Sequence, residues 1–133
     1  LGMAKWVGEV HDPDRLPDPL PEERLLALYR EDPRPKSLDD FPELIAHLRR
    51  LHPIRYRYLF DGLKAVYLRG LEPLHDQNDA LRFVHFVDQL YNLGLDLKAS
   101  GAPLKDLFPE SYRHGAFAKK YGRALSRLAE LLG

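Results

Sequence analysis

The sequence predicts an α/β fold that is rich in helix, and three consecutive segments of its second half carry this prediction. Residues 65–69 (AVYLR) form an apolar run typical of a strand, and residues 95–100 (LDLKAS) alternate between apolar and polar side chains. Between them, residues 76–93 repeat apolar side chains at helical spacing. A strand, a long helix and a second strand with short joins form a βαβ unit. Its two strands are therefore expected to be parallel, with a right-handed crossover.

The first part of the chain has a different composition, because eight of its eleven prolines lie within the first 53 residues. Residues 11–21 hold a proline at every second to fourth position, which excludes a helix there. A short helix is expected over 21–30, and residues 31–37 (EDPRPKS) are expected to form a loop. We therefore divide the chain into a proline-rich connector or insertion, 1–37, and an α/β part, 38–133.

Two further helices complete the predicted α/β part. One spans about residues 40–51 and ends before Pro53, and the other begins at Tyr112 or Gly115 and runs to Leu132. Gly94 stands where a helix C-terminal cap belongs, after the long helix. Two strands are too few for a parallel sheet. The missing pairing is expected from a further domain or from residues 5–10 (KWVGEV).

Composition excludes several classes of protein. The chain has 133 residues, the length of one domain, with equal numbers of acidic and basic residues and no cysteine. Disulfides and thiolate zinc sites are therefore excluded, and a reducing cytoplasmic location is expected. No run of apolar residues is long enough for a membrane span. Nothing in the overall charge favours nucleic acid as a partner. Because the chain begins at Leu1, we expect a fragment of a longer protein.

No catalytic or metal-binding motif is present in the sequence. It contains no phosphate-binding G-x-x-x-x-G-K-[ST] loop and no apolar strand ending in two acidic residues, so no catalytic residue is assigned. The six histidines show no metal-ligand spacing, and His85 is expected to pack in the core. Asp76 and Asp79 are expected to cap the long helix. Ser100 and Gly101 alone are too weak a signal for a nucleophile.

The last helix carries a local basic surface. One side of it is apolar and is expected to face inward, while four cations lie largely off that side. The expected partner-binding residues are Arg113, Lys119, Lys120 and Arg123, with Arg127 on the same helix. Two interpretations stay open: a solvated helix face, and a contact for phosphate, an acidic protein or nucleic acid.

Four stretches in order resemble the end of one protein family. They are HPIRY (52–56), the run from His75 to Gly101 that contains ALRFVHFVDQLY and ends in Ser-Gly, PLKDLF (103–108) and HGAFAKKYGRALSRLAEL (114–131). This series is similar to the C-terminal region of the ZapE family of P-loop ATPases, which includes mitochondrial AFG-like relatives. The details look most like the bacterial high-GC branch, while the first 50 residues match only loosely.

The resemblance implies a partial P-loop NTPase-like, AAA+-like domain followed by a C-terminal helix. It implies that the intact protein binds ATP and Mg²⁺ and hydrolyses ATP, in cell division or in protein quality control. It also implies that Arg82 and Arg127, at matched family positions, sense the nucleotide. No cofactor is expected for this chain alone. Its expected partners are the missing N-terminal ATPase half, another protein or a second copy. The alternative is a stand-alone, non-catalytic module that binds an acidic protein or nucleic acid through its basic C-terminal helix.

Overall fold

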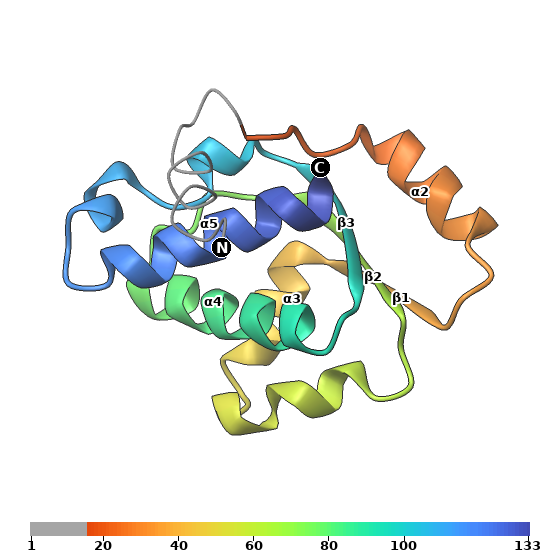
Figure 1. The fold of residues 1–133 in the computed structure, drawn as a ribbon, viewed down its shortest axis with the longest axis horizontal. Coiled ribbons are helices and arrows are strands. Elements are labelled where there is room, and N and C mark those ends of the chain that lie inside the picture. Colours follow the sequence, from red (N-terminus) through yellow and green to blue (C-terminus); the bar gives the residue numbers. More distant parts are fainter. Residues whose placement is uncertain (1–15) are drawn as a thin grey trace, which may run out of the picture.

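The computed structural model describes residues 16–133, and a three-stranded parallel sheet lies at their centre (Figure 1). The strands are β1 (Lys36–Asp40), β2 (Ala65–Leu71) and β3 (Asp96–Gly101), and they lie in that order across the sheet. Both pairings are parallel, which confirms the βαβ unit predicted for β2 and β3. The strand expected at residues 5–10 lies outside the described residues.

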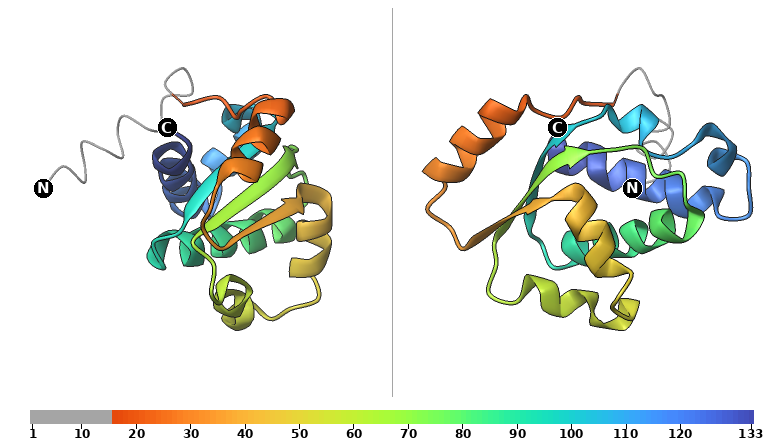
Figure 2. Two further views of the ribbon diagram at one scale, coloured as in Figure 1. Left: turned by 90° about the vertical axis from the view of Figure 1, so that its right-hand side faces the viewer. Right: turned by 180° about the vertical axis from the view of Figure 1, so that it is seen from behind.

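The sheet is the middle layer of three, with helices on both of its faces, and the side chains of its central strand β2 pack on both sides. Its Val66 and Leu68 side chains belong to the main hydrophobic core, whereas Ala65 and Tyr67 belong to a smaller cluster on the opposite face. Among the described helices, α2 (Glu22–Glu31) covers that opposite face. Helices α3 (Phe41–Leu48), α4 (Gln77–Asn92) and α5 (Ala118–Leu132) cover the other face, as two further views show (Figure 2). Burial on both faces explains why β2 reads as a continuous apolar run.

Strand β1 corrects the prediction of a loop over residues 31–37. It begins at Lys36 and pairs along its whole length with β2, so the boundary placed after residue 37 falls inside a strand. Its sequence, KSLDD, has one apolar residue, and its side chains are at most partly buried. Such a strand forms because β2 offers it a free edge, and its own composition gives no signal of it.

Helix α4 begins and ends where the sequence predicts. The Asp76 Oδ1 atom accepts a hydrogen bond of 3.0 Å from the backbone N–H of Asp79, which is the expected N-cap. Gly94 has φ of 75°, the left-handed conformation of a C-terminal cap. The buried face is wider than the predicted stripe, because it also includes Phe83 and Phe86.

Three segments near α3 and α5 form 3₁₀ helices that the sequence did not predict. Helix α3 ends at Leu48, three residues early, and a 3₁₀ helix, η2 (Pro53–Phe60), follows it. Two short 3₁₀ helices, η3 (Leu104–Asp106) and η4 (Glu110–Arg113), precede α5, which begins only at Ala118. Aromatic packing holds this loop: the Tyr121 ring lies 5.0 Å from that of Phe108 and 4.9 Å from that of Tyr112.

Candidate functional site

The carboxyl ends of the strands form the edge at which parallel α/β proteins usually bind ligands. Here β2 and β3 change register between Leu68 and Leu71, so the backbone at Gly70 leaves the regular ladder. The Gly70 N–H group therefore lacks a partner in the ladder, and the buried Ser100 hydroxyl accepts a hydrogen bond of 3.1 Å from it. Ser100 therefore has a structural role at this edge. Arg69 and Asp40 join β2 to β1 nearby, with Nε and Oδ1 2.7 Å apart.

Asp79 lies at the centre of a cluster of three charged residues. Arg49, at the C-terminal end of α3, holds its carboxylate at two points, Nε to Oδ1 at 2.8 Å and Nη2 to Oδ2 at 2.6 Å. Arg82 adds a third contact, Nη1 to Oδ1 at 3.1 Å. The Arg49 hydrogen bonds, and then the positive charge of both arginines, lower the pKa of Asp79 although burial opposes them. Two cations share the Asp79 carboxylate, and the negative charge of Asp76 also acts on Arg49.

The two arginines proposed as nucleotide sensors occupy different surroundings. Arg82 lies in the Asp79 cluster with 32% of its side chain exposed, so its guanidinium still reaches solvent. Arg127 is 20% exposed, pairs with Asp88 on α4 and lies 4.9 Å above the Tyr91 ring. In this structure Arg127 ties α5 to α4, and the fold does not place the two arginines on one shared carboxylate.

The predicted partner-binding residues also separate into two groups. Lys119, Lys120 and Arg123 are exposed on α5, and the Lys120 Nζ atom lies 5.8 Å from the centre of the Phe117 ring. Arg113 lies instead in η4, where its Nη2 donates a hydrogen bond of 3.0 Å to the backbone oxygen of Lys105. Three cations of the predicted set therefore form an exposed surface on α5.

A second basic region, which the sequence analysis overlooked, spans residues 47–58 (HLRRLHPIRYRY). We define the α3–η2 basic surface by its exposed residues. They are His47, Arg49, Arg50, His52, Ile54, Arg55, Arg57 and Tyr58. The sequence signal was present, since these twelve residues hold four arginines and no acidic residue. The cations of α5 follow helical spacing and so form a recognisable pattern in the sequence. The cations of residues 47–58 lie across a helix end and show no such spacing.

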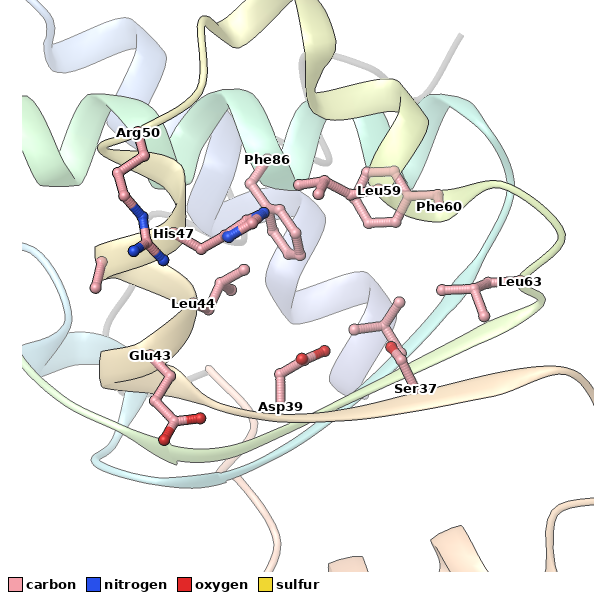
Figure 3. A pocket seen from close by; sticks show the side chains of 12 residues that line it. Ser37, Asp39, Glu43, Leu44, His47, Arg50, Leu59, Phe60, Leu63 and Phe86 are labelled. Carbon is pink, nitrogen blue, oxygen red and sulfur yellow. The ribbon is translucent and has the colours of Figure 1, made fainter.

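A groove of about 530 Å³ adjoins this surface, between β1, α3 and η2 (Figure 3). Its apolar wall consists of Leu44, Leu59, Phe60, Leu63, Val66 and Phe86. His47 and Arg50 border it on the α3 side, while Asp39 projects from β1 and Glu43 lies at the start of α3. The groove therefore combines an apolar wall with charges of both signs.

The histidines do not form a metal site in the part of the chain that the structure describes. Over residues 16–133, no three His, Cys, Asp or Glu side chains are placed to hold one ion. His85 is exposed on α4, so the prediction that it packs in the core is wrong. It stands between the buried pairs 83–84 and 86–87, on the outward side of the helix. Among the same residues, no helix has the length and apolar character needed to cross a membrane.

The residues present do not fit ATP by themselves. A P-loop ATPase surrounds the phosphates of its nucleotide with the backbone N–H groups of a G-x-x-x-x-G-K-[ST] loop, and the sequence contains no such loop. The described glycines with positive φ are Gly62, Gly70, Gly94 and Gly101, and none belongs to such a loop. Arg82 and Arg49 could supply at most a peripheral phosphate contact, in competition with Asp79.

Comparison with known proteins identifies the family. Neither the curated proteins nor the solved structures provided a match to the chain. A family model described as AFG1-like ATPase matches residues 22–133, from the first residue of α2 to the end of the chain. This range contains all three strands and the motifs that resemble ZapE and its AFG-like relatives. The chain belongs to the AFG1-like ATPase family.

Proposed function

We propose that this chain is the C-terminal part of the ATP-hydrolysing domain of a ZapE-type ATPase from the bacterial high-GC branch. One observation carries the proposal: the family match covers residues 22–133, yet these 133 residues contain no phosphate-binding loop. In this proposal another part of the ATPase supplies that loop, the Mg²⁺ ligands and the nucleotide. The present chain supplies the three-stranded parallel sheet and the arginines near it, Arg49 and Arg82.

The first test reads the DNA upstream of the codon for Leu1. An in-frame G-x-x-x-x-G-K-[ST] sequence there supports the proposal, whereas a stop codon followed by a start at Met3 contradicts it. The second test measures ATP hydrolysis by the chain alone and after mixing with a phosphate-loop part of an AFG1-like ATPase. We expect hydrolysis only in the mixture, and turnover by the chain alone would contradict the proposal.

Arg82 is the better placed of the two proposed sensors, because it is partly exposed and shares a carboxylate with Arg49. In the intact ATPase, Arg82→Ala is expected to lower hydrolysis and nucleotide affinity. Arg127→Ala needs a structural control, since Arg127 also holds α5 against α4. Asp88→Asn weakens the same contact without removing the arginine. If the two variants lose activity equally, Arg127 positions the helix; a loss confined to Arg127→Ala supports sensing.

The cellular role follows from the family resemblance. We propose that the intact protein acts in the cytoplasm in support of cell division, with protein quality control as the other context of the family. Depleting the protein and examining cell length distinguishes these roles. Elongated, undivided cells support the first, while normal division with accumulated misfolded protein supports the second.

A stand-alone binding module is the second candidate, favoured by the exposed Lys119, Lys120 and Arg123 on α5. These cations would contact an acidic protein or nucleic acid. A salt titration of binding to an acidic protein and to single-stranded DNA tests this role. Affinity that falls with salt and is lost in Lys119→Glu/Arg123→Glu supports the module, whereas flat dependence on salt removes it.

A further inference from the structure

Positive charge is concentrated in one short stretch of an otherwise neutral chain. Residues 47–58 carry four arginines and two histidines with no acidic residue, although the whole chain has a formal net charge of zero. Arg49 is paired with Asp79, so the positive potential of this stretch comes mainly from Arg50, Arg55 and Arg57. It therefore attracts anionic groups from solution to the end of α3 and to η2.

The geometry of η2 places apolar side chains among these cations. A 3₁₀ helix has three residues per turn, so side chains three apart lie in one row. The row of Pro53, Tyr56 and Leu59 is partly or fully buried. The other two rows are exposed from Ile54 to Tyr58, and the row of Ile54 and Arg57 turns inward at Phe60, which belongs to the core. One outward row holds Ile54 and Arg57, and the other holds Arg55 and Tyr58. Each exposed row thus combines an apolar residue with an arginine.

The apolar members of these rows are unusually exposed. Ile54 is 70% and Tyr58 54% exposed, two of the three large hydrophobic side chains that stand out in this way among the described residues. Arg57 donates a hydrogen bond of 2.9 Å from Nη2 to the Tyr58 hydroxyl, and its guanidinium lies 4.9 Å from the ring. These two side chains hold each other in place, which lowers the entropy lost when a partner binds.

The cations of the α3–η2 basic surface differ in whether they are already paired with an acidic residue. Arg49 is bound to Asp79, whereas Arg50 and Arg55 make no side-chain hydrogen bond or ion pair with the described residues. Arg50 lies at the border of the groove together with His47 (Figure 3). A ligand that lies along η2 can therefore pair with Arg55 and Arg50 in turn and reach the apolar wall of the groove.

We propose that the α3–η2 basic surface and its groove bind an extended acidic segment of a partner protein that carries apolar side chains. Carboxylates of the segment pair with Arg50 and Arg55, and its apolar side chains cover Ile54 and enter the groove. The composition of the groove favours a peptide over nucleic acid. Its wall is largely aliphatic, whereas single-stranded nucleic acid needs aromatic faces for stacking.

The test measures binding to the full chain by fluorescence anisotropy. The probes are a labelled short peptide of Glu and Asp with two leucines and a phenylalanine, the same peptide with Ser in place of its apolar residues, and single-stranded oligothymidylate. The variants are Arg50→Glu/Arg55→Glu and Ile54→Ser, all at exposed positions. The matched control is Arg24→Glu/Arg30→Glu, which makes the same charge change at exposed positions of α2. Lys119→Glu/Arg123→Glu tests the competing surface on α5. Circular dichroism and thermal unfolding verify that each variant folds.

We expect the acidic-apolar peptide to bind, with affinity at least about tenfold lower for Arg50→Glu/Arg55→Glu, a change worth about 1.4 kcal/mol. Ile54→Ser and the serine peptide should each weaken binding several-fold, and the α2 control should leave it unchanged. No binding by the wild-type chain would overturn the proposal. Tighter binding of oligothymidylate, or a loss seen only in the α5 variant, would overturn it too. None of these outcomes depends on ATP hydrolysis, so the family function is tested separately.

Discussion

At the scale of single residues, buried carboxylates connect helices that are distant in sequence. Asp79 binds arginines from α3 and α4. Asp32, at the end of α2, accepts hydrogen bonds from Arg34 and from the Tyr67 hydroxyl of β2. Arg34 also pairs with Asp96 at the start of β3. These contacts hold α3 to α4 and α2 to the sheet.

Asp79→Asn tests the first of these contacts. Asn keeps the size and the backbone cap of Asp79 but removes the charge that holds Arg49 and Arg82, so we expect a loss of about 2 kcal/mol in the free energy of unfolding. The folded pKa of Asp79 is lowered from its ordinary 3.8, so its stabilisation is present above that value and disappears as pH falls through the folded pKa. Urea unfolding at neutral pH and below pH 4 measures both effects. If the free energy of unfolding of the variant falls equally steeply with decreasing pH, the pH dependence comes from other groups.

Tyr67→Phe tests the contact between α2 and β2. Burial, followed by the hydrogen bond to Asp32, raises the pKa of Tyr67 from 10.0 to about 12. The hydroxyl therefore stabilises the fold fully below pH 10, and this contribution is lost as pH rises through about 12. We expect Phe to cost about 1 kcal/mol at neutral pH and to reduce the loss of stability above pH 10. Tyr58→Phe, at an exposed position, is the control and should change neither quantity.

At the scale of elements, the ends of β2 and β3 depend on backbone geometry. Gly101 has φ of 116°, and a Cβ atom there would overlap the backbone nitrogen of Leu71 and lie 2.6 Å from its carbonyl oxygen. The same crowding brings Ala102 N–H to the Leu71 oxygen at 2.9 Å. With the Ser100 hydroxyl on Gly70, this arrangement gives a physical reason for the Ser-Gly pair that ends β3.

Gly101→Ala is expected to destabilise the chain by about 3 kcal/mol, because both the backbone conformation and the close approach oppose a side chain. Gly94→Ala separates the two causes. Gly94 has φ of 75° but open space around it, so only the conformational cost of about 1 kcal/mol applies. Thermal unfolding of both variants measures the difference. Equal losses would show that the close contact with Leu71 relaxes without cost.

At the scale of the whole molecule, β1 leaves one edge of the sheet without a strand partner among the described residues. Leu20 N–H bonds to the Ala99 oxygen at 2.8 Å and so covers the end of β3, whereas β1 lies at the other edge with β2 as its only strand partner among the described residues. An edge strand of this kind offers unpaired backbone groups to another strand. In the proposed intact ATPase the further part would cover this edge.

We therefore expect the isolated chain to self-associate with rising concentration in sedimentation velocity. Ser37→Lys places a charge on β1 and should reduce association, since charged edge strands resist pairing. Ser111→Lys, an exposed position in η4, is the matched control and should leave it unchanged. A single monomeric species at all concentrations would count against an interface at this edge.

The sequence by itself determined the elements whose signals are local. The apolar run of β2, the periodic helix α4 with Asp76 and Gly94 at its ends, and the motif series that indicated the family all stand in contiguous residues. Other features are visible only in the folded structure. The polar segment KSLDD forms strand β1 by pairing with β2, and Arg49 binds Asp79, which lies 30 positions away in the sequence. The folded structure also sets Arg127 against Asp88 and joins the end of α3 to η2 as one basic surface. Periodicity and capping act within a few residues of the chain, whereas strand pairing and ion pairs depend on distances that only the folded backbone sets.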